Sequence, residues 1–232
     1  MNEVKIQALI NALVNRPNLH NQKLVDLANE AQAFQLQPDW FWHALIRSFA
    51  TWGGAMGYQN LVNNGGLDDL QYFRIKDLVE NDNFTYSDIV AFLEQVFAEA
   101  NIRYSSKKAR YLAYNFYMFD NHQEVIDLSN ELWELNNVEG FIERVMQFKG
   151  IGKKYARNIG MDLNHPAFIN TIAIDSRIEK VLSALEYNGP KTYENKEAAL
   201  LNIAEVAGLT GWQLDRLLFN FNFYYLNILN FN

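Results

Sequence analysis

Apolar residues recur every three or four positions over much of the chain, which is the spacing of one buried face of an α-helix. These stripes comprise Val4, Ile6, Leu9, Ile10 and Leu13; Phe41, Leu45, Ile46 and Phe49; Ile89, Phe92, Leu93, Val96 and Phe97; Leu112, Phe116 and Phe119; Phe141, Ile142, Val145, Met146 and Phe148; and Leu214, Leu217, Leu218 and Phe221. Ser87 is the expected N-cap of the third stripe. The nearest candidate for a strand, Ile172-Ala173-Ile174, is too short to predict a sheet. The pattern therefore predicts an all-α protein of about ten helices.

The composition suits a folded domain. The chain has 232 residues, of which 49% are apolar and 20% charged, so it can build one large domain or two lobes. The absence of cysteine excludes a disulfide scaffold, a thiolate zinc site and an iron–sulfur cluster bound by cysteine. Four histidines, His20, His43, His122 and His165, have no paired ligand spacing, and no phosphate-binding P-loop occurs. We expect no metal and no cofactor.

No segment has the pattern of an export signal or a membrane span. Glu3 and Lys5 interrupt the apolar positions at the start of the chain. The aromatic stretch from Phe219 to Phe231 is too short for a bilayer and contains several asparagines. We expect a soluble cytoplasmic protein without membrane contact.

Positive charge is concentrated in two windows of a chain whose net charge is -7. Residues 102–119 and 144–161 contain no acid and hold 9 of the 20 basic residues. The basic residues are Arg103, Lys107, Lys108 and Arg110, and Arg144, Lys149, Lys153, Lys154 and Arg157. Two basic patches on an acidic body can follow a phosphate backbone. The alternative is that both windows are ordinary solvated helix faces.

The second window contains a glycine turn between two helical segments. Gly150-Ile151-Gly152 follows the apolar helix Phe141–Phe148, and a second helix is expected to begin near Lys153. Glycine tolerates positive φ, so the turn can be very tight, with Ile151 packed back between the helices. The backbone N–H groups of the turn and of the next helix then form an anion site suited to a DNA phosphate, beside Lys149 and Lys153. An ordinary glycine-rich helix–helix turn is the alternative.

These residues resemble the helix-hairpin-helix base-excision DNA glycosylase superfamily. Phe148-Lys-Gly-Ile-Gly-Lys-Lys-Tyr-Ala156 is similar to its hairpin, and Ile172-Ala-Ile-Asp-Ser-Arg-Ile178 to its aspartate segment. By this resemblance Lys154 matches the nucleophile of lyase-competent members, and Asp175 matches the catalytic aspartate. From the residues alone, Lys154 is a solvated helix lysine and Asp175 an N-cap of the helix from Ser176 to Leu185.

Within the superfamily the chain most resembles the compact 8-oxoguanine glycosylases of archaea and some bacteria, over most of residues 40–221. Three further stretches carry this likeness: Ala50–Gly57, which is similar to the lesion-pocket segment, Ile102–Arg110, and Leu214-Asp215 followed by Phe219. Trp52, Met56, Trp212 and Phe219 are candidates to sandwich a flipped base. Each is alternatively a core residue. Arg103, Lys107 and Lys108 are candidates for contact with the DNA backbone, or else solvated surface residues.

The resemblance implies two helical lobes with an active site between them. One lobe would comprise residues 1–45 and 175–232, and the other residues 46–174, including the hairpin at about 141–163. It also implies excision of an oxidised purine such as 8-oxoguanine from double-stranded DNA, and a Schiff base on Lys154 that leads to strand cleavage. We expect a monomer associated with the nucleoid. The other two hypotheses are a non-catalytic helix-hairpin-helix DNA-binding protein and an all-α interaction protein without a DNA function.

Overall fold

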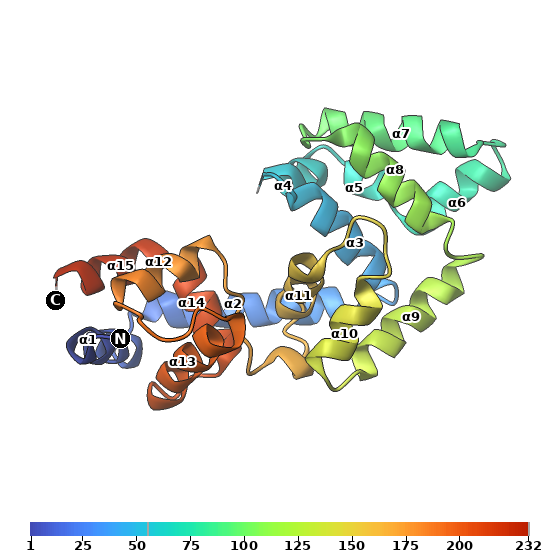
Figure 1. Cartoon of the computed structure of the whole chain (residues 1–232). Coiled ribbons are helices and arrows are strands. Elements are labelled where there is room, and N and C mark those ends of the chain that lie inside the picture. The colour runs from blue at the N-terminus through green and yellow to red at the C-terminus, as the bar shows by residue number, and fades with distance from the viewer. Residues whose placement is uncertain (55, 232) are drawn as a thin grey trace. The chain divides into compact units, whose positions relative to one another are not determined.

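A computed structural model describes residues 1–54 and 56–231, with Phe231 described by its backbone only. The described residues form fifteen α-helices, one short 3-10 helix and no strand (Figure 1), which confirms the all-α prediction. Ile172–Ile174 lies in a loop. More helices are present than the apolar stripes predict, because short helices such as α5 (Gly66–Asp69) have no complete stripe. Ala55, in the segment that resembles a lesion pocket, lies outside the described residues.

The chain divides into two compact units, described separately below. Unit 1 comprises Met1–Phe34 and Gly160–Asn232, and unit 2 comprises Gln35–Ile159. The sequence-based boundaries lie at residues 45 and 175, so both differ from the observed ones by more than ten residues. The second boundary falls inside α11 (Lys153–Asp162). A sequence pattern shows where helices begin and end, whereas the division into units depends on which residues pack together.

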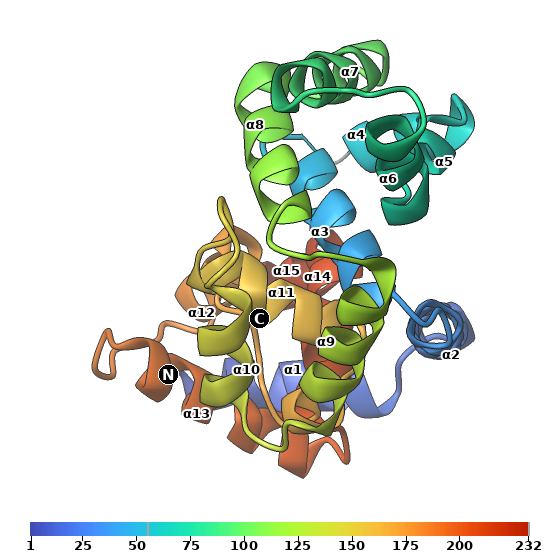
Figure 2. The same ribbon diagram turned by 90° about the vertical axis from the view of Figure 1, so that its right-hand side faces the viewer.

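Unit 2 holds the glycine turn and all of the predicted DNA-contacting residues. Its helices are α3 (Trp40–Thr51), α4 (Met56–Asn63), α5, α6 (Tyr72–Glu80), α7 (Tyr86–Glu99), α8 (Ser105–Phe116), α9 (His122–Glu134), α10 (Val138–Val145) and the first part of α11. Figures 1 and 2 both show α7 and α8 side by side, and these two helices pack along their length. Helix α3 packs against α4, α8 and α9.

The buried face of α3 follows its sequence pattern, since Phe41, Leu45, Ile46 and Phe49 are all buried. Helix α7 begins earlier than expected. Thr85, rather than Ser87, is its N-cap, and the Thr85 hydroxyl accepts from the backbone N–H of Asp88. The Asp88 carboxylate in turn accepts from the backbone N–H of Thr85, which completes a capping box. The reciprocal pair satisfies two N–H groups, whereas a serine cap alone satisfies one.

Unit 1 consists of both ends of the chain. Its elements are α1 (Glu3–Val14), α2 (Asn18–Gln35), the end of α11, a 3-10 turn (Pro166–Phe168), α12 (Ser176–Ala184), α13 (Tyr193–Val206), α14 (Gly211–Asn220) and α15 (Asn222–Phe231). Helix α15 packs against α1 and α12, and α14 packs against α12 and α13. The stripe on α1 begins later than predicted, because Val4 is 66% exposed while Leu9 and Leu13 are buried. Within the described residues no helix is both long and apolar enough to cross a membrane.

Candidate nucleic-acid interface

The glycine turn of unit 2 joins α10 to α11, which begins at Lys153 as predicted. Gly150 has φ +88°, and a Cβ there would lie 2.4 Å from Cδ2 of Tyr111 and 2.8 Å from Cε1 of Phe49. Only glycine fits this position. Ile151 is 6% exposed, as expected for the residue that fills the turn. Gly152 does not adopt positive φ, and a Cβ there would meet no atom within 4 Å. Gly150 is required by the backbone conformation of the turn, whereas Gly152 leaves the start of α11 without a side chain.

Asn115 of α8 holds the hairpin in place. Its side chain is fully buried, its Oδ1 accepts from the backbone N–H of Lys149 at 2.8 Å, and its Nδ2 donates to the Lys149 carbonyl at 3.1 Å. One carboxamide therefore satisfies both backbone groups of the residue before Gly150. Asn115 was not among the predicted site residues. The sequence does contain an indication of this role. Asn115 is a polar amide inside the apolar stripe from Leu112 to Phe116, and a buried amide needs hydrogen-bond partners.

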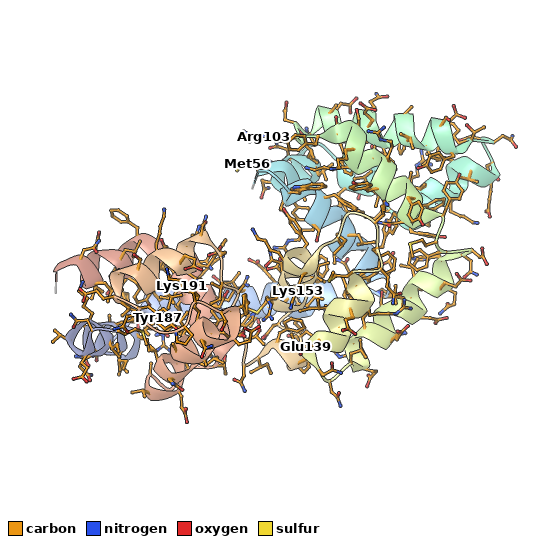
Figure 3. The ribbon with its side chains drawn as sticks, in the orientation of Figure 1. Met56, Arg103, Glu139, Lys153, Tyr187 and Lys191 are labelled. Atoms are coloured by element: carbon orange, nitrogen blue, oxygen red, sulfur yellow. The ribbon has the colours of Figure 1, made fainter. Side chains whose placement is uncertain are left out.

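The hairpin lysines are on the surface. Lys149, Lys153 and Lys154 are exposed, and Figure 3 labels Lys153 at the start of α11. The ammonium nitrogen of Lys149 lies 5.9 Å from the ring centre of Tyr114 on α8, within the range of a cation–π interaction. The structure therefore places three cations next to the N-terminus of α11, where the helix dipole also favours an anion.

Lys108 does not lie on the surface that the sequence predicts for it. Its side chain is fully buried, and its Nζ donates to the carbonyl of Trp52 at 2.6 Å. Trp52 is the C-cap of α3, where a cation is electrostatically favoured. Burial lowers the pKa of Lys108 to about 8. A buried ammonium group cannot reach a phosphate, so Lys108 supports the interface from inside. Arg103 and Lys107 are exposed.

Trp52 is the centre of an aromatic cluster that the sequence did not reveal. Its ring centre lies 6.3 Å from Tyr111, with the two planes nearly parallel, 6.4 Å from Tyr155 and 6.5 Å from Tyr104. The Lys107 nitrogen lies 5.3 Å from the Trp52 ring centre. Tyr155 directly follows Lys154 on α11. Met56, the other predicted pocket residue of unit 2, is 65% exposed (Figure 3).

In unit 1, Asp175 is the N-cap of α12, as its position before Ser176 predicts. Its Oδ1 accepts from the backbone N–H groups of Arg177 at 2.8 Å and Ile178 at 3.0 Å. The side chain uses one carboxylate oxygen for the cap and remains partly exposed. A capping carboxylate at a helix N-terminus is held in one orientation, which is also what an acid needs in order to act on a substrate.

A second acid is buried near this cap. Asp215 is 2% exposed, and its Oδ1 accepts from the backbone N–H of Ala173 at 2.8 Å, two residues before Asp175. Its Oδ2 lies 3.0 Å from Nε of Arg216, which also pairs with Asp162 at 3.0 Å. Burial raises the pKa of Asp215 to about 6, against the opposing charge of Arg216. Asp215 ties α14 to the segment that leads into Asp175.

The two aromatic residues predicted for the base pocket in unit 1 lie in different environments. Trp212 is 5% exposed, and its Nε1 donates to the Met161 carbonyl at 2.7 Å, so its indole is satisfied inside the core. Phe219 is 37% exposed, and the guanidinium carbon of Arg177 lies 4.0 Å from its ring centre. Nη1 of Arg177 also donates to the Phe219 carbonyl at 3.1 Å. Through Arg177 the structure links Phe219 to the Asp175 cap.

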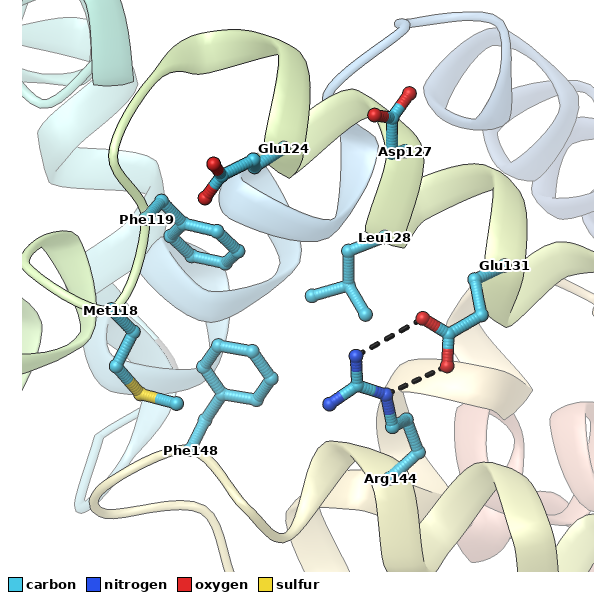
Figure 4. Close-up of a pocket in the computed structure, with 8 residues that line it drawn as sticks. All are labelled: Met118, Phe119, Glu124, Asp127, Leu128, Glu131, Arg144 and Phe148. Atoms are coloured by element: carbon cyan, nitrogen blue, oxygen red, sulfur yellow. Dashed lines mark hydrogen bonds and ion pairs between the residues drawn. The ribbon is translucent and has the colours of Figure 1, made fainter.

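Unit 2 also has a cavity of about 280 Å³, which is shown in Figure 4. It is lined by Met118, Phe119, Glu124, Asp127, Leu128, Glu131, Arg144 and Phe148. Arg144 pairs with Glu131 through Nε and Nη2, at 2.7 and 3.0 Å, so the remaining carboxylates leave the lining acidic. Such a lining disfavours phosphate, and none of the predicted site residues contributes to it.

No protein-family model, no curated protein and no solved structure matches this chain. In the described ranges, no group of three or more His, Asp or Glu side chains is arranged to hold a metal ion. The candidate interface therefore rests on the geometry above. Unit 2 brings together the hairpin, Lys107, Trp52 and Lys154, and unit 1 brings together Asp175, Asp215 and Phe219.

Proposed function

We propose that this protein is a DNA glycosylase with lyase activity, which removes an oxidised purine such as 8-oxoguanine from double-stranded DNA. The observation that carries the proposal is the hairpin. Gly150 at positive φ, buried Ile151 and a helix that starts at Lys153 form a turn whose outer side is open. The exposed cations beside it give this turn the charge that a DNA phosphate requires.

In this proposal the DNA backbone contacts the hairpin and the exposed cations of unit 2. The N–H groups at the start of α11 take one phosphate, and Lys149 and Lys153 flank it. Arg103 and Lys107 extend the positive surface along the start of α8. Lys108 is omitted from the contact set because it is buried. Neither basic window contains an acid, so positive charge is concentrated in these two segments although the net charge of the chain is -7.

Lys154 is proposed to be the nucleophile. Its neutral amine attacks C1′ of the damaged nucleotide, so that a C1′–N bond forms as the bond to the base breaks, and the base leaves with a proton. The C1′–O4′ bond then breaks and O4′ takes a proton from solvent, which gives a protonated imine between C1′ and Nζ. Loss of a proton from C2′ then breaks the C3′–O3′ bond and cleaves the strand. Lys154 is exposed near the start of α11, where a substrate can reach it.

Asp175 is proposed to stabilise the positive charge that develops on the sugar as the base leaves. Its cap hydrogen bonds use Oδ1, so Oδ2 is not needed for the cap. Trp52, Met56 and Phe219, none of which is buried, are each proposed as candidates for contact with the extruded base. We assign Trp212 to the core because its indole nitrogen is already bonded to Met161.

Borohydride trapping tests the proposal. Wild-type protein mixed with an 8-oxoguanine duplex and sodium borohydride is expected to give a covalent protein–DNA adduct, seen as a shifted band on a denaturing gel. The Lys154→Gln variant is expected to bind the duplex but give no adduct. Lys191→Gln is the matched control, because Lys191 is also exposed but lies outside the proposed contact set, and it is expected to give the wild-type adduct. An equal adduct from Lys154→Gln would refute the role of Lys154.

The same assay separates the alternative functions. Duplex binding without an adduct on any of a panel of oxidised, deaminated and alkylated bases would favour a non-catalytic hairpin protein. Absence of duplex binding at low salt would favour an interaction protein without a DNA function. If an adduct forms with a lesion other than 8-oxoguanine, the proposed reaction at Lys154 stands and the proposed substrate is wrong.

A further inference from the structure

One side of α8 carries a row of aromatic and basic residues. Lys107, Tyr111 and Tyr114 follow each other at spacings of four and three residues, which places them on one side of the helix, and Tyr104 directly precedes the helix as its N-cap. Tyr104 is 67% exposed and Tyr114 is 52% exposed, while Tyr111 is partly exposed. We call this row, together with Trp52 and Lys149, the α8 stripe.

The members of the α8 stripe contact one another. The Lys107 nitrogen lies 5.3 Å from the ring centre of Trp52 and 5.6 Å from that of Tyr111. The Lys149 nitrogen lies 5.9 Å from the ring centre of Tyr114. Tyr111 also packs against Gly150, so the stripe joins the hairpin without a gap. Residues 102–119 contain no acid, and the stripe therefore has no carboxylate of its own segment to oppose a phosphate.

We propose that the α8 stripe binds unpaired nucleotides, with bases stacked on the exposed rings of Tyr104 and Tyr114 and the partly exposed ring of Tyr111, and with phosphates paired with Lys107 and Lys149. Aromatic rings alternating with cations are the combination that holds single strands, because every base presents a flat face and every nucleotide a phosphate. This activity requires neither a damaged base nor any reaction at Lys154, so it goes beyond the proposed function.

The rings point to single strands rather than to duplex. In a duplex the base faces are stacked on each other, so only phosphates and groove edges are available, and lysines without aromatic rings would suffice. Tyrosines in the core of this protein have a different environment from those of the stripe. Tyr72 is fully buried and its hydroxyl donates to the Phe119 carbonyl at 3.1 Å, whereas the tyrosines at both ends of the stripe are left in solvent.

Fluorescence anisotropy with a labelled oligothymidine and with an undamaged duplex of equal length tests this proposal. The Lys154→Gln variant is used throughout so that no reaction occurs. We expect the single strand to bind, and Tyr114→Ala and Tyr104→Ala each to weaken it about tenfold, as loss of one stacking ring does elsewhere. Tyr86→Ala is the matched control. Tyr86 is 46% exposed on α7, outside the stripe, and its loss is expected to change the affinity less than twofold.

The possible outcomes are distinct. No binding to the single strand would overturn the proposal, and so would an unchanged affinity in Tyr104→Ala and Tyr114→Ala, because the attraction would then be purely electrostatic. An equal loss in Tyr86→Ala and Tyr114→Ala would also overturn it, because the effect would not be specific to the stripe. Tyr114→Phe is expected to retain binding, since the ring remains. Failure of the borohydride assay with retained single-strand binding would reject the glycosylase and leave the α8 stripe in place. Thermal unfolding of each variant checks that the fold is intact.

Discussion

The carboxamide of Asn115 bonds to both backbone groups of Lys149, at 2.8 Å to the N–H and 3.1 Å to the carbonyl. This pair joins the middle of α8 to the residue that enters the glycine turn. The hairpin is therefore positioned by a side chain more than thirty residues away in sequence.

Replacement of Asn115 tests this pair. Asn115→Ala removes the partner of the part-buried Lys149 N–H and carbonyl, and we expect it to lower the free energy of unfolding by about 1–3 kcal/mol. Asn115→Asp keeps the acceptor for the Lys149 N–H but sets a carboxylate oxygen against the Lys149 carbonyl, so it should destabilise at least as much. Urea denaturation measures both. A loss below about 0.5 kcal/mol in Asn115→Ala would show that water replaces the amide.

The two glycines of the turn are predicted to differ. Gly150→Ala must place a Cβ 2.4 Å from Tyr111 at φ +88°, and we expect a loss of at least about 2 kcal/mol. Gly152→Ala meets open space at negative φ and should change stability by less than about 1 kcal/mol. Its methyl group stands on the open side of the turn, so it should weaken duplex binding instead. Denaturation and anisotropy separate the two effects, and equal stabilities of the two variants would contradict the assigned backbone geometry.

Lys108 should make the free energy of unfolding depend on pH in the alkaline range. Its pKa is about 8 in the folded state and near 10.5 in the unfolded chain, so between these values the unfolded state binds more protons. Stability contributed by this group therefore rises as pH increases from about 8 to 10.5 and is lowest below pH 8. In Lys108→Met that rise is expected to disappear.

Urea denaturation at pH 7, 8, 9 and 10 measures the difference between wild type and Lys108→Met. Lys107→Met is the control, because Lys107 is exposed and adjacent. A difference that stays constant over the whole range would show that Lys108 does not lose its proton in the folded state.

Substitutions of Asp175 can separate its role as an N-cap from its proposed role in base excision. Asparagine caps helices about as well as aspartate, so Asp175→Asn should retain stability within about 0.5 kcal/mol while losing the negative charge. Asp175→Ala removes the cap and should cost about 1 kcal/mol. If Asp175 stabilises the developing positive charge, the two variants should lose base excision to the same extent. Excision on an 8-oxoguanine duplex and thermal unfolding are the measurements, and full excision by Asp175→Asn would assign the residue to the cap alone.

Much of the secondary structure could be predicted from the sequence. The apolar faces of α3 and α7, the glycine turn before Lys153 and the cap at Asp175 all follow from residues a few positions apart. The start of α7 was misplaced because two residues, Thr85 and Ser87, could both cap it, and only the reciprocal bond with Asp88 distinguishes them.

The environment of individual side chains was harder to predict. Lys107 and Lys108 are adjacent and chemically identical, yet one is exposed beside the Trp52 ring and the other is buried beneath its carbonyl. A helix turns by about 100° per residue, so neighbours can face opposite environments. The acid-free window identified both lysines as basic surface, but the packing of α8 against the end of α3 separates them.

By itself, the sequence determined most of the longer helices, the cap at Asp175 and the tight turn at Gly150, because these depend on backbone preferences and hydrogen bonds between near neighbours. The tertiary structure alone decided that Asn115 holds Lys149, that Lys108 supports Trp52 and that tyrosines from α8 and α11 surround this tryptophan. These contacts join residues 34 to 103 positions apart. No local pattern encodes them, because they form only when the helices pack.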